Sequence, residues 1–274
     1  MPSTYAHYRF GQAVLAGLPE TLQTLIQDHL DLYHLGLHGP DLLFYDHPLW
    51  STSVNRVGYG THDLPGEAFF APAAQKLAQL DNPPAHLAYL YGFLCHFALD
   101  RSCHGYIDEK IAASGVRHTE IEVEFDRMLL LQDGLDPLRQ SLTDHIHPST
   151  SSACVIADFF PGVTARQIYH AERSFLFYNR LLIAPGSVKR SMIFSLLHLT
   201  GNYTEMHGLV VNRQPNPLCK DSNQMLTRLY VRAIPEARHL IETWLDTAAG
   251  RCPWDDLYRY TFGSKYVPRE EEQR

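Results

Sequence analysis

A long uncharged segment constrains the fold of this chain more than any other feature. Between Pro83 and Leu99 there is no Asp, Glu, Lys or Arg. The segment is shorter than the roughly 20 apolar residues that a membrane span requires, and it contains two histidines. Its leucines follow one helical stripe, while aromatic residues and His96 occupy the other side. This pattern predicts a core helix that other helices cover all round.

Apolar residues at three- and four-residue spacing dominate the rest of the sequence, whereas clear strand alternation is absent. We therefore predict an all-α protein, a single multi-helix domain over residues 1–274 with a polynuclear metal site between helices. Leu42–Ala71 is the least regular segment, Asn212–Asp221 is the best loop or lid, and Arg269–Arg274 is a polar tail predicted to fray. The expected helices are Phe10–Gly17, Glu20–Leu30, Ala71–Leu80, Ala85–Ala113, Glu120–Leu131, Ala165–Ile183, Ser187–His198 and Ser222–Ala248.

Charge and cysteine usage narrow the class of protein. The chain has 23 Lys and Arg against 30 Asp and Glu, a net charge of −7, which argues against a stable complex with nucleic acid through a basic surface. Its five cysteines form no CxxC motif, and the first residues lead into no apolar run. These features predict a cytoplasmic protein without a leader or transmembrane segment. Its 16 histidines are the compositional oddity, and the oligomeric state stays open.

The first carboxylate after the uncharged segment belongs to a metal-binding pattern. His96, Asp100 and His104 follow one another at four-residue spacing, so a helix presents all three on one face. After Ser114-Gly115, His118 and Glu122 repeat that spacing at the start of the next expected helix. A single histidine is usually structural, but five ligand-type residues in phase favour a metal site. Imidazole and carboxylate ligands are typical of catalytic zinc.

Asp41 is a second isolated carboxylate, because it carries the only formal charge from Tyr33 to Tyr45. It needs a partner, and a hydrogen bond to backbone at the Gly39-Pro40 turn would suffice. His7 and His62 have no interpretation from their local sequence alone.

Together these residues resemble the zinc-dependent phospholipase C family, which is related to the S1/P1 nucleases. The resemblance runs from about Tyr5 to Asp126, and it is strongest over YLYGFLCHFALDRSCH and GVRHTEIEVEFDR. It implies an all-α enzyme with two or three zinc ions, although other divalent metals remain open. The implied metal ligands are His7, Asp41, His62, His96, Asp100, His104, His118 and Glu122.

The resemblance also implies which residues share an ion. Asp41, His62, His96 and Asp100 would hold one zinc, with Asp100 bridging to a second metal. His104, His118 and Glu122 would hold another ion, and His7 with Asp100 would belong to a third. Secreted members complete that third site with an N-terminal Trp. This chain begins Met1-Pro2 and has no Trp before Trp50, so water or a nearby group such as Tyr5 would take that place.

The implied activity is phosphodiester hydrolysis by a metal-activated water, with Asp41 as the catalytic base and a phospholipid or small diester as substrate. An S1/P1-like nuclease or nucleotidase and a non-catalytic helical metal-binding protein are the alternatives. An HD-type phosphohydrolase is a further alternative, but the metal ligands at four-residue spacing on the two later helices fit that class less well. His198 and His207 form a polar cluster of unknown role. Three arginines could bind phosphate but are expected mainly at the surface: Arg9, Arg101 and Arg117. Four aromatic residues could form a wall of the substrate site but are expected mainly in the core or at its rim: Tyr8, Tyr45, Phe69 and Phe70.

Overall fold

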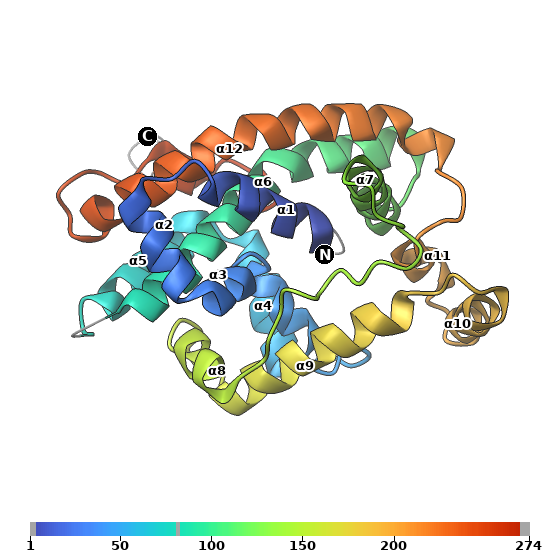
Figure 1. Ribbon diagram of the computed structural model, residues 1–274, viewed down its shortest axis with the longest axis horizontal. Coiled ribbons are helices and arrows are strands. Elements are labelled where there is room, and N and C mark those ends of the chain that lie inside the picture. The colour runs from blue at the N-terminus through green and yellow to red at the C-terminus, as the bar shows by residue number, and fades with distance from the viewer. Residues whose placement is uncertain (1–3, 81–82, 269–274) are drawn as a thin grey trace.

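The computed structural model describes residues 4–80 and 83–268, and its regular elements in this part of the chain are helices (Figure 1). Only two isolated β-bridges, Pro65 with Thr261 and Tyr260 with Tyr266, accompany them there. The predicted all-α single domain is confirmed. In chain order the elements are α1 (Thr4–Leu15), α2 (Glu20–Asp28), α3 (Leu30–Gly36), the 3₁₀ helix η1 (Gly39–Tyr45), α4 (Ser53–Asp63), α5 (Gly66–Leu77), α6 (Pro84–Ser114), α7 (His118–Gln132), α8 (Thr150–Ala157), α9 (Ala165–Leu182), α10 (Ser187–Leu199), α11 (Tyr203–Met206), η2 (His207–Leu209), η3 (Pro217–Cys219), α12 (Lys220–Ala248) and η4 (Asp256–Arg259).

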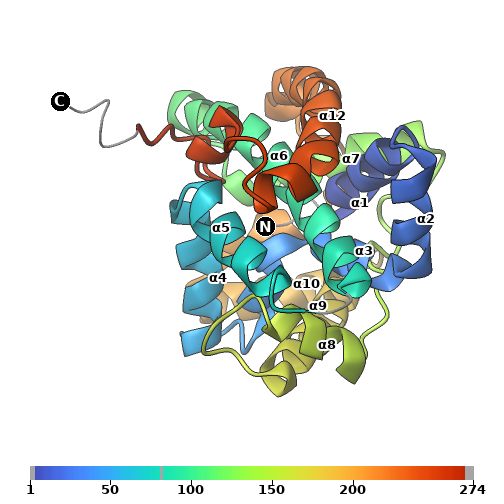
Figure 2. The same cartoon turned by 90° about the vertical axis from the view of Figure 1, so that its left-hand side faces the viewer.

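The uncharged segment lies in α6, and every residue from Leu87 to Asp100 is buried. Helices α1, α3 and α12 pack against α6, while α8 and α9 lie on the side of the molecule opposite α12 (Figures 1 and 2). The prediction of a core helix is therefore confirmed, and α6 extends one residue beyond the expected range at each end. Its central position lets it contribute side chains to sites on several of its faces.

Two glycines allow α3 and α6 to cross with their backbones almost in contact. A Cβ atom on Gly92 would lie 2.1 Å from the carbonyl oxygen of Tyr33, and one on Gly36 would lie 2.2 Å from that of Tyr89. Any larger residue would push the helices apart. This close approach fixes α3, and with it the following turn η1, against the middle of α6.

Several expected boundaries were wrong. Helix α1 begins at Thr4 rather than Phe10, and the expected helix Glu20–Leu30 ends at Asp28, where His29 leaves helical geometry before α3 begins. The Leu42–Ala71 segment is regular over much of its length, because it contains α4 and the start of α5. Thr52 caps α4 by accepting a hydrogen bond from Asn55.

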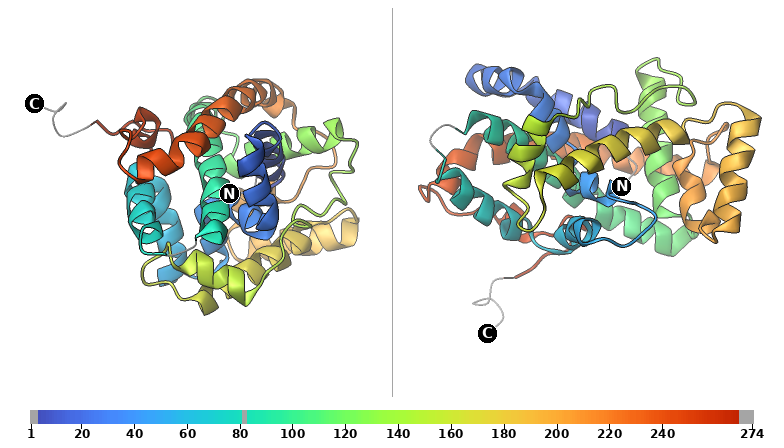
Figure 3. Two further views of the ribbon diagram at one scale, coloured as in Figure 1. Left: turned by 60° about the vertical axis from the view of Figure 1, so that its left-hand side comes forward. Right: turned by 90° about the horizontal axis from the view of Figure 1, so that it is seen from below.

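The later helices agree more closely with expectation. Helix α9 begins at the predicted Ala165 and runs along the lower side of the molecule in Figure 1, toward α10. Figure 3 shows from below how α9 crosses the molecule. Helix α8 was missed, and the tail Arg269–Arg274 lies outside the described residues. Among the described helices, none is both long enough and apolar enough to cross a membrane.

Candidate metal centre

The carboxylate of Asp100 lies at the middle of a buried cluster of imidazoles. Its Oδ2 atom is 3.2 Å from Nε2 of His96 and 3.6 Å from Nε2 of His62. Its Oδ1 atom is 3.2 Å from Nε2 of His7 and 3.7 Å from Nε2 of His104. Each oxygen thus faces a different pair of histidines, which is the arrangement expected of a carboxylate that bridges two cations.

Two groups able to hold a metal share His96. His7, His96 and Asp100 form one, and Asp41, His62 and His96 form the other, with all ligand atoms of a group within 4.8 Å of one another. Asp41 comes from η1, and its Oδ1 is 3.0 Å from Nε2 of His62 on α4. The structure therefore brings together residues from four helices, and sequence proximity links only His96 and Asp100.

A third group joins the end of α6 to the start of α7. Oε1 of Glu122 is 3.1 Å from Nε2 of His118 and 3.4 Å from Nε2 of His104. The chain turns between the two helices at Gly115, whose φ of 70° is left-handed and favours glycine. A small cavity lies among the predicted ligands, lined in part by His7, Asp100, His104 and Glu122.

The tautomers of three histidines fit a metal. In each of them Nδ1 lies near a backbone carbonyl oxygen, which can only accept, so Nδ1 must carry the proton. The Nε2 atom is then the one that faces the carboxylates, where it can bind either a proton or a metal ion. Fixing Nδ1–H on a carbonyl is the usual support of metal-ligating histidines. These contacts are His62 with Gly58 at 3.0 Å, His96 with Leu37 at 3.3 Å and His104 with Phe262 at 3.1 Å.

The electrostatics show the same demand for positive charge. Burial raises the pKa of the Asp100 carboxyl, but the charges of His104 and His96 and the hydrogen bonds of His62 and His7 together lower it well below its usual value. Burial lowers the pKa of His62, yet hydrogen bonds to Asp100 and Asp41 raise it to about 10. The carboxylates also raise the pKa of His104, whereas burial lowers that of His7. A metal ion at this centre would replace the protons that the carboxylates favour on His62 and His104.

The chain's C-terminal segment also contributes to the centre, although its sequence carried no signal of this. Besides the Phe262 carbonyl on His104, Oγ of Ser264 accepts a hydrogen bond from the Gly105 backbone N–H at 2.8 Å. The same hydroxyl donates to the Arg101 carbonyl at 2.6 Å. These bonds fix the end of α6 that carries His104.

A second residue without a sequence signal is Asp126 on α7. Its carboxylate accepts the backbone N–H groups of Tyr5 at 3.0 Å and Ala6 at 2.8 Å. Helix N-termini leave such donors unpaired, so Asp126 caps α1 from another helix. The cap explains why α1 begins before the expected residue, and it places His7 in the centre.

The secondary candidates lie elsewhere. Arg9, Arg101 and Arg117 have the carboxylate partners Asp133, Glu236 and Glu205. The side chains of Arg9 and Arg117 are partly exposed, as expected, whereas only 11% of the Arg101 side chain is exposed. The Tyr5 hydroxyl donates to Asp133 at the far end of α7. His198 and His207 stack on Tyr203, and neither belongs to a metal-capable group within the described residues. In the expected lid, Asn212 and Asn216 donate to Glu120 on α7.

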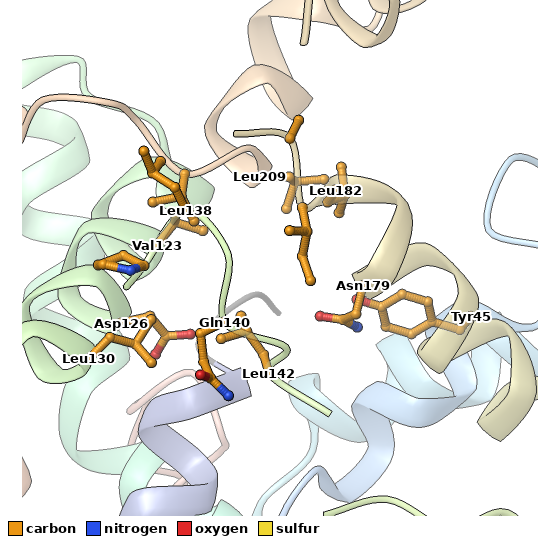
Figure 4. A pocket seen from close by; sticks show the side chains of 14 residues that line it. Tyr45, Val123, Asp126, Leu130, Leu138, Gln140, Leu142, Asn179, Leu182 and Leu209 are labelled. Carbon is orange, nitrogen blue, oxygen red and sulfur yellow. The ribbon is translucent and has the colours of Figure 1, made fainter. Parts of the chain in front are cut away.

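A mainly aliphatic pocket lies between α7 and α9, one helical turn from two predicted ligands. Figure 4 shows Asp126 and Leu130 on one side and Asn179 and Leu182 on the other, with Tyr45 beside Asn179. Tyr45 and Asp126 follow Asp41 and Glu122 by four residues. Of the four aromatic residues considered for a substrate wall, Tyr45 lines this pocket, whereas Phe70 is fully buried in the core.

Comparison with known proteins agrees with this geometry. Residues 6–173, more than half of the chain, match the family described as zinc dependent phospholipase C. No curated protein and no solved structure matches the chain. The match spans all the residues of the three ligand groups around Asp100, from His7 to Glu122. The chain therefore belongs to the zinc-dependent phospholipase C family, whose members are phosphodiester hydrolases.

Proposed function

We propose that this protein hydrolyses phosphodiester bonds in phospholipids, by a zinc-dependent mechanism at the centre around Asp100. The observation that carries the proposal is the bridging position of Asp100, with one oxygen directed to each side of the cluster. Hydrolysis of a phosphodiester develops negative charge on phosphoryl and leaving-group oxygens, and adjacent cations stabilise that charge.

The ligand assignment follows the contacts. We propose two or three ions, because His7 and Asp100 alone are an incomplete set of ligands for the third ion. The bond of the Tyr5 hydroxyl to Asp133 argues against this hydroxyl as its completing ligand, and residues 1–3 lie outside the described part of the chain. The proposed ligands are Asp41, His62, His96 and Asp100 for the first ion, His104, His118 and Glu122 for the second, and His7 with Asp100 for the third.

When bound, zinc supplies Lewis-acid chemistry, which polarises phosphoryl oxygens and lowers the pKa of water. The chain's own contribution is orientation. Asp41 is buried at the end of the cluster and held by His62, so its carboxylate can accept a hydrogen bond from the attacking water and take its proton. The water oxygen bonds to phosphorus, the bond from phosphorus to the leaving alcohol breaks, and the alcohol oxygen gains the proton that Asp41 took from the water.

The pocket between α7 and α9 supports a lipid substrate. Its lining includes Leu130, Leu138, Leu142 and Leu182, which suit the apolar part of a phospholipid next to the headgroup phosphate (Figure 4). A nuclease or nucleotidase would need aromatic stacking platforms near the metals, and Tyr45 is the aromatic residue in this lining. The aliphatic lining favours the lipid substrate, whereas the exposed Tyr59, which stacks on Phe44 beside His62, is the platform that a nuclease would use.

We also propose that the whole chain, residues 1–274, forms the family's domain. The family match ends at residue 173, but α12 packs along α6 and the segment with Phe262 and Ser264 reaches the centre. The C-terminal third therefore completes the site, and removing it should release metal as well as destabilise the fold.

One experiment separates the alternatives. The zinc-loaded protein is given phosphatidylcholine, a chromogenic phosphodiester, single-stranded DNA and 3′-nucleotides, with and without a chelator. We expect chelator-sensitive release of a phosphorylated headgroup from phosphatidylcholine, and a loss of at least about 100-fold in kcat for Asp41→Asn. Turnover of DNA or nucleotides instead would support the nuclease. Absence of any turnover would support a non-catalytic metal-binding protein.

Metal analysis tests the ligand groups independently of turnover. His104→Ala and Glu122→Ala should each remove about one zinc equivalent from folded protein, because both residues belong to the same group. His86→Ala is the control, since His86 is also on α6 but pairs with Asp158, outside the cluster. Full zinc content in both ligand variants would contradict the assignment.

A further inference from the structure

A separate group of two histidines and one aspartate lies at the junction of η1, the loop after it, and α9. Asp46 and His47 follow η1, and His170 lies on α9, so the group joins segments far apart in the chain. Nδ1 of His47 is 3.2 Å from Oδ1 of Asp46, and Nδ1 of His170 is 3.1 Å from the same oxygen. None of these residues belongs to the centre around Asp100.

The aspartate of this group is buried and held in one orientation. Only 4% of Asp46 is exposed, and its Oδ2 atom accepts a hydrogen bond from the Thr52 hydroxyl at 2.9 Å. Oδ1 is left to the two imidazoles. Within the described residues, Asp46 has no ion pair with lysine or arginine, so the two imidazoles are its partners at ion-pair distance. A buried carboxylate in this setting favours binding of a further cation.

The two histidines approach from the solvent side with their rings in parallel. Their ring centroids are 4.5 Å apart at an interplanar angle of 22°, and about half of each side chain is exposed. An ion can therefore reach the group from solution. His47 holds this position with a φ of 53°, in the left-handed region that non-glycine residues adopt at a cost. The surrounding contacts thus keep an unfavourable backbone geometry that presents its imidazole to Asp46.

The three ligand atoms lie within 4.8 Å of one another, which is compatible with binding one transition-metal ion. In a tetrahedral zinc site with bonds of about 2.0–2.1 Å, neighbouring ligand atoms are about 3.3 Å apart. The two nitrogen-to-oxygen distances of 3.1 and 3.2 Å are close to that separation. Two imidazoles and one carboxylate leave a fourth position for water, and this ligand set prefers zinc or a similar nitrogen-binding ion to calcium or magnesium.

We propose that Asp46, His47 and His170 form an additional transition-metal site that joins the loop after η1 to α9. The ion would replace the imidazole protons that now face Oδ1, and it would fix a loop that begins five residues after Asp41. Other surface pairs lack this ligand set. Asp31 with His147 and Asp255 with His239 have similar distances, 3.1 and 2.9 Å, but only one imidazole each. The inference does not depend on the proposed phospholipase activity.

The test counts bound zinc in the full-length protein after equilibration with micromolar Zn²⁺, by elemental analysis. We expect His170→Ala and His47→Gly to hold one equivalent less than the wild type, with unchanged circular dichroism. His47→Gly is informative because glycine tolerates the φ of 53°, so it removes the ligand without adding backbone strain. His147→Ala, which alters a pair with a single imidazole, should retain the full zinc content.

A second readout is the midpoint of thermal unfolding when Zn²⁺ is added to protein whose Asp100 centre is already loaded. The wild type and His147→Ala should show a further rise, and the two site variants should not. Equal zinc content and an equal rise in all four proteins would overturn the proposal. If the site variants differ from the wild type in zinc content and thermal shift but the protein does not turn over phospholipid, only the proposed function is contradicted.

Discussion

The cap that Asp126 provides to α1 gives the sharpest prediction of how the centre depends on its surroundings. Asp126→Ala leaves two backbone N–H groups, those of Tyr5 and Ala6, without their acceptor. Loss of a helix cap costs about 1 kcal/mol, and a buried donor left unpaired costs roughly 1–3 kcal/mol. Because the Ala6 bond is buried and the Tyr5 bond partly so, we expect a total loss of about 2–4 kcal/mol in the free energy of unfolding.

The same substitution should weaken zinc binding, because α1 carries His7. The assay is urea unfolding of the zinc-loaded protein, followed by zinc analysis of the folded variant. The matched control is Asp133→Ala, which removes another bond between α1 and the end of α7. Asp133 pairs with Arg9 and Tyr5 at the surface, so its loss should cost at most about 1 kcal/mol and leave zinc content unchanged. If Asp126→Ala is no more destabilising than Asp133→Ala, the capping argument is wrong.

Two further predictions concern the packing around the centre. Gly92→Ala should lower the free energy of unfolding by roughly 3 kcal/mol or more, because its Cβ would lie 2.1 Å from the Tyr33 carbonyl oxygen. The control Gly60→Ala has open space around its Cβ and should be neutral or slightly stabilising. Equal effects of the two substitutions would contradict the close crossing of α3 and α6. Burial, together with the charges of His34 and His147, lowers the pKa of His145 to about 3, so the folded state binds fewer protons than the unfolded state between pH 3 and 6.5, and stability falls as pH drops. His145→Gln should therefore lose roughly 1–2 kcal/mol less than the wild type between pH 7 and pH 5, and equal losses would count against a neutral His145 packed against His34, His38 and Tyr8.

The spacing of residues in the sequence was sufficient to predict a contact between two metal ligands where both lie on one helix or on consecutive helices. The four-residue spacing of His96, Asp100 and His104 predicted a shared face, and Gly115 correctly marked the break before α7, which begins two residues before the expected Glu120. In the structure the Nε2 atoms of both histidines meet Asp100. Such pairs follow from helix geometry alone, because residues four apart always lie on the same side.

Local spacing failed where a distant segment decides the outcome. Nothing near Thr4 indicates that α1 begins there, since Asp126 on α7 supplies the cap. Nothing in the sequence around Asp46 indicates that His170 comes to meet it from α9. Helix α4 was missed for a different reason, because its cap of Thr52 and Asn55 is local but lies in a segment of irregular composition. The contact of its His62 with Asp41, in contrast, depends on how α4 packs against η1.

The sequence by itself determined that this is an all-helical member of the zinc-dependent phospholipase C family, because apolar periodicity and ligand spacing are local properties of the chain. Only the tertiary structure decided how the ligand groups join. It gave each Asp100 oxygen its own pair of histidines, used the Phe262 carbonyl to fix the tautomer of His104, and brought His170 to Asp46. These contacts depend on the packing of helices distant in sequence, which no local pattern encodes.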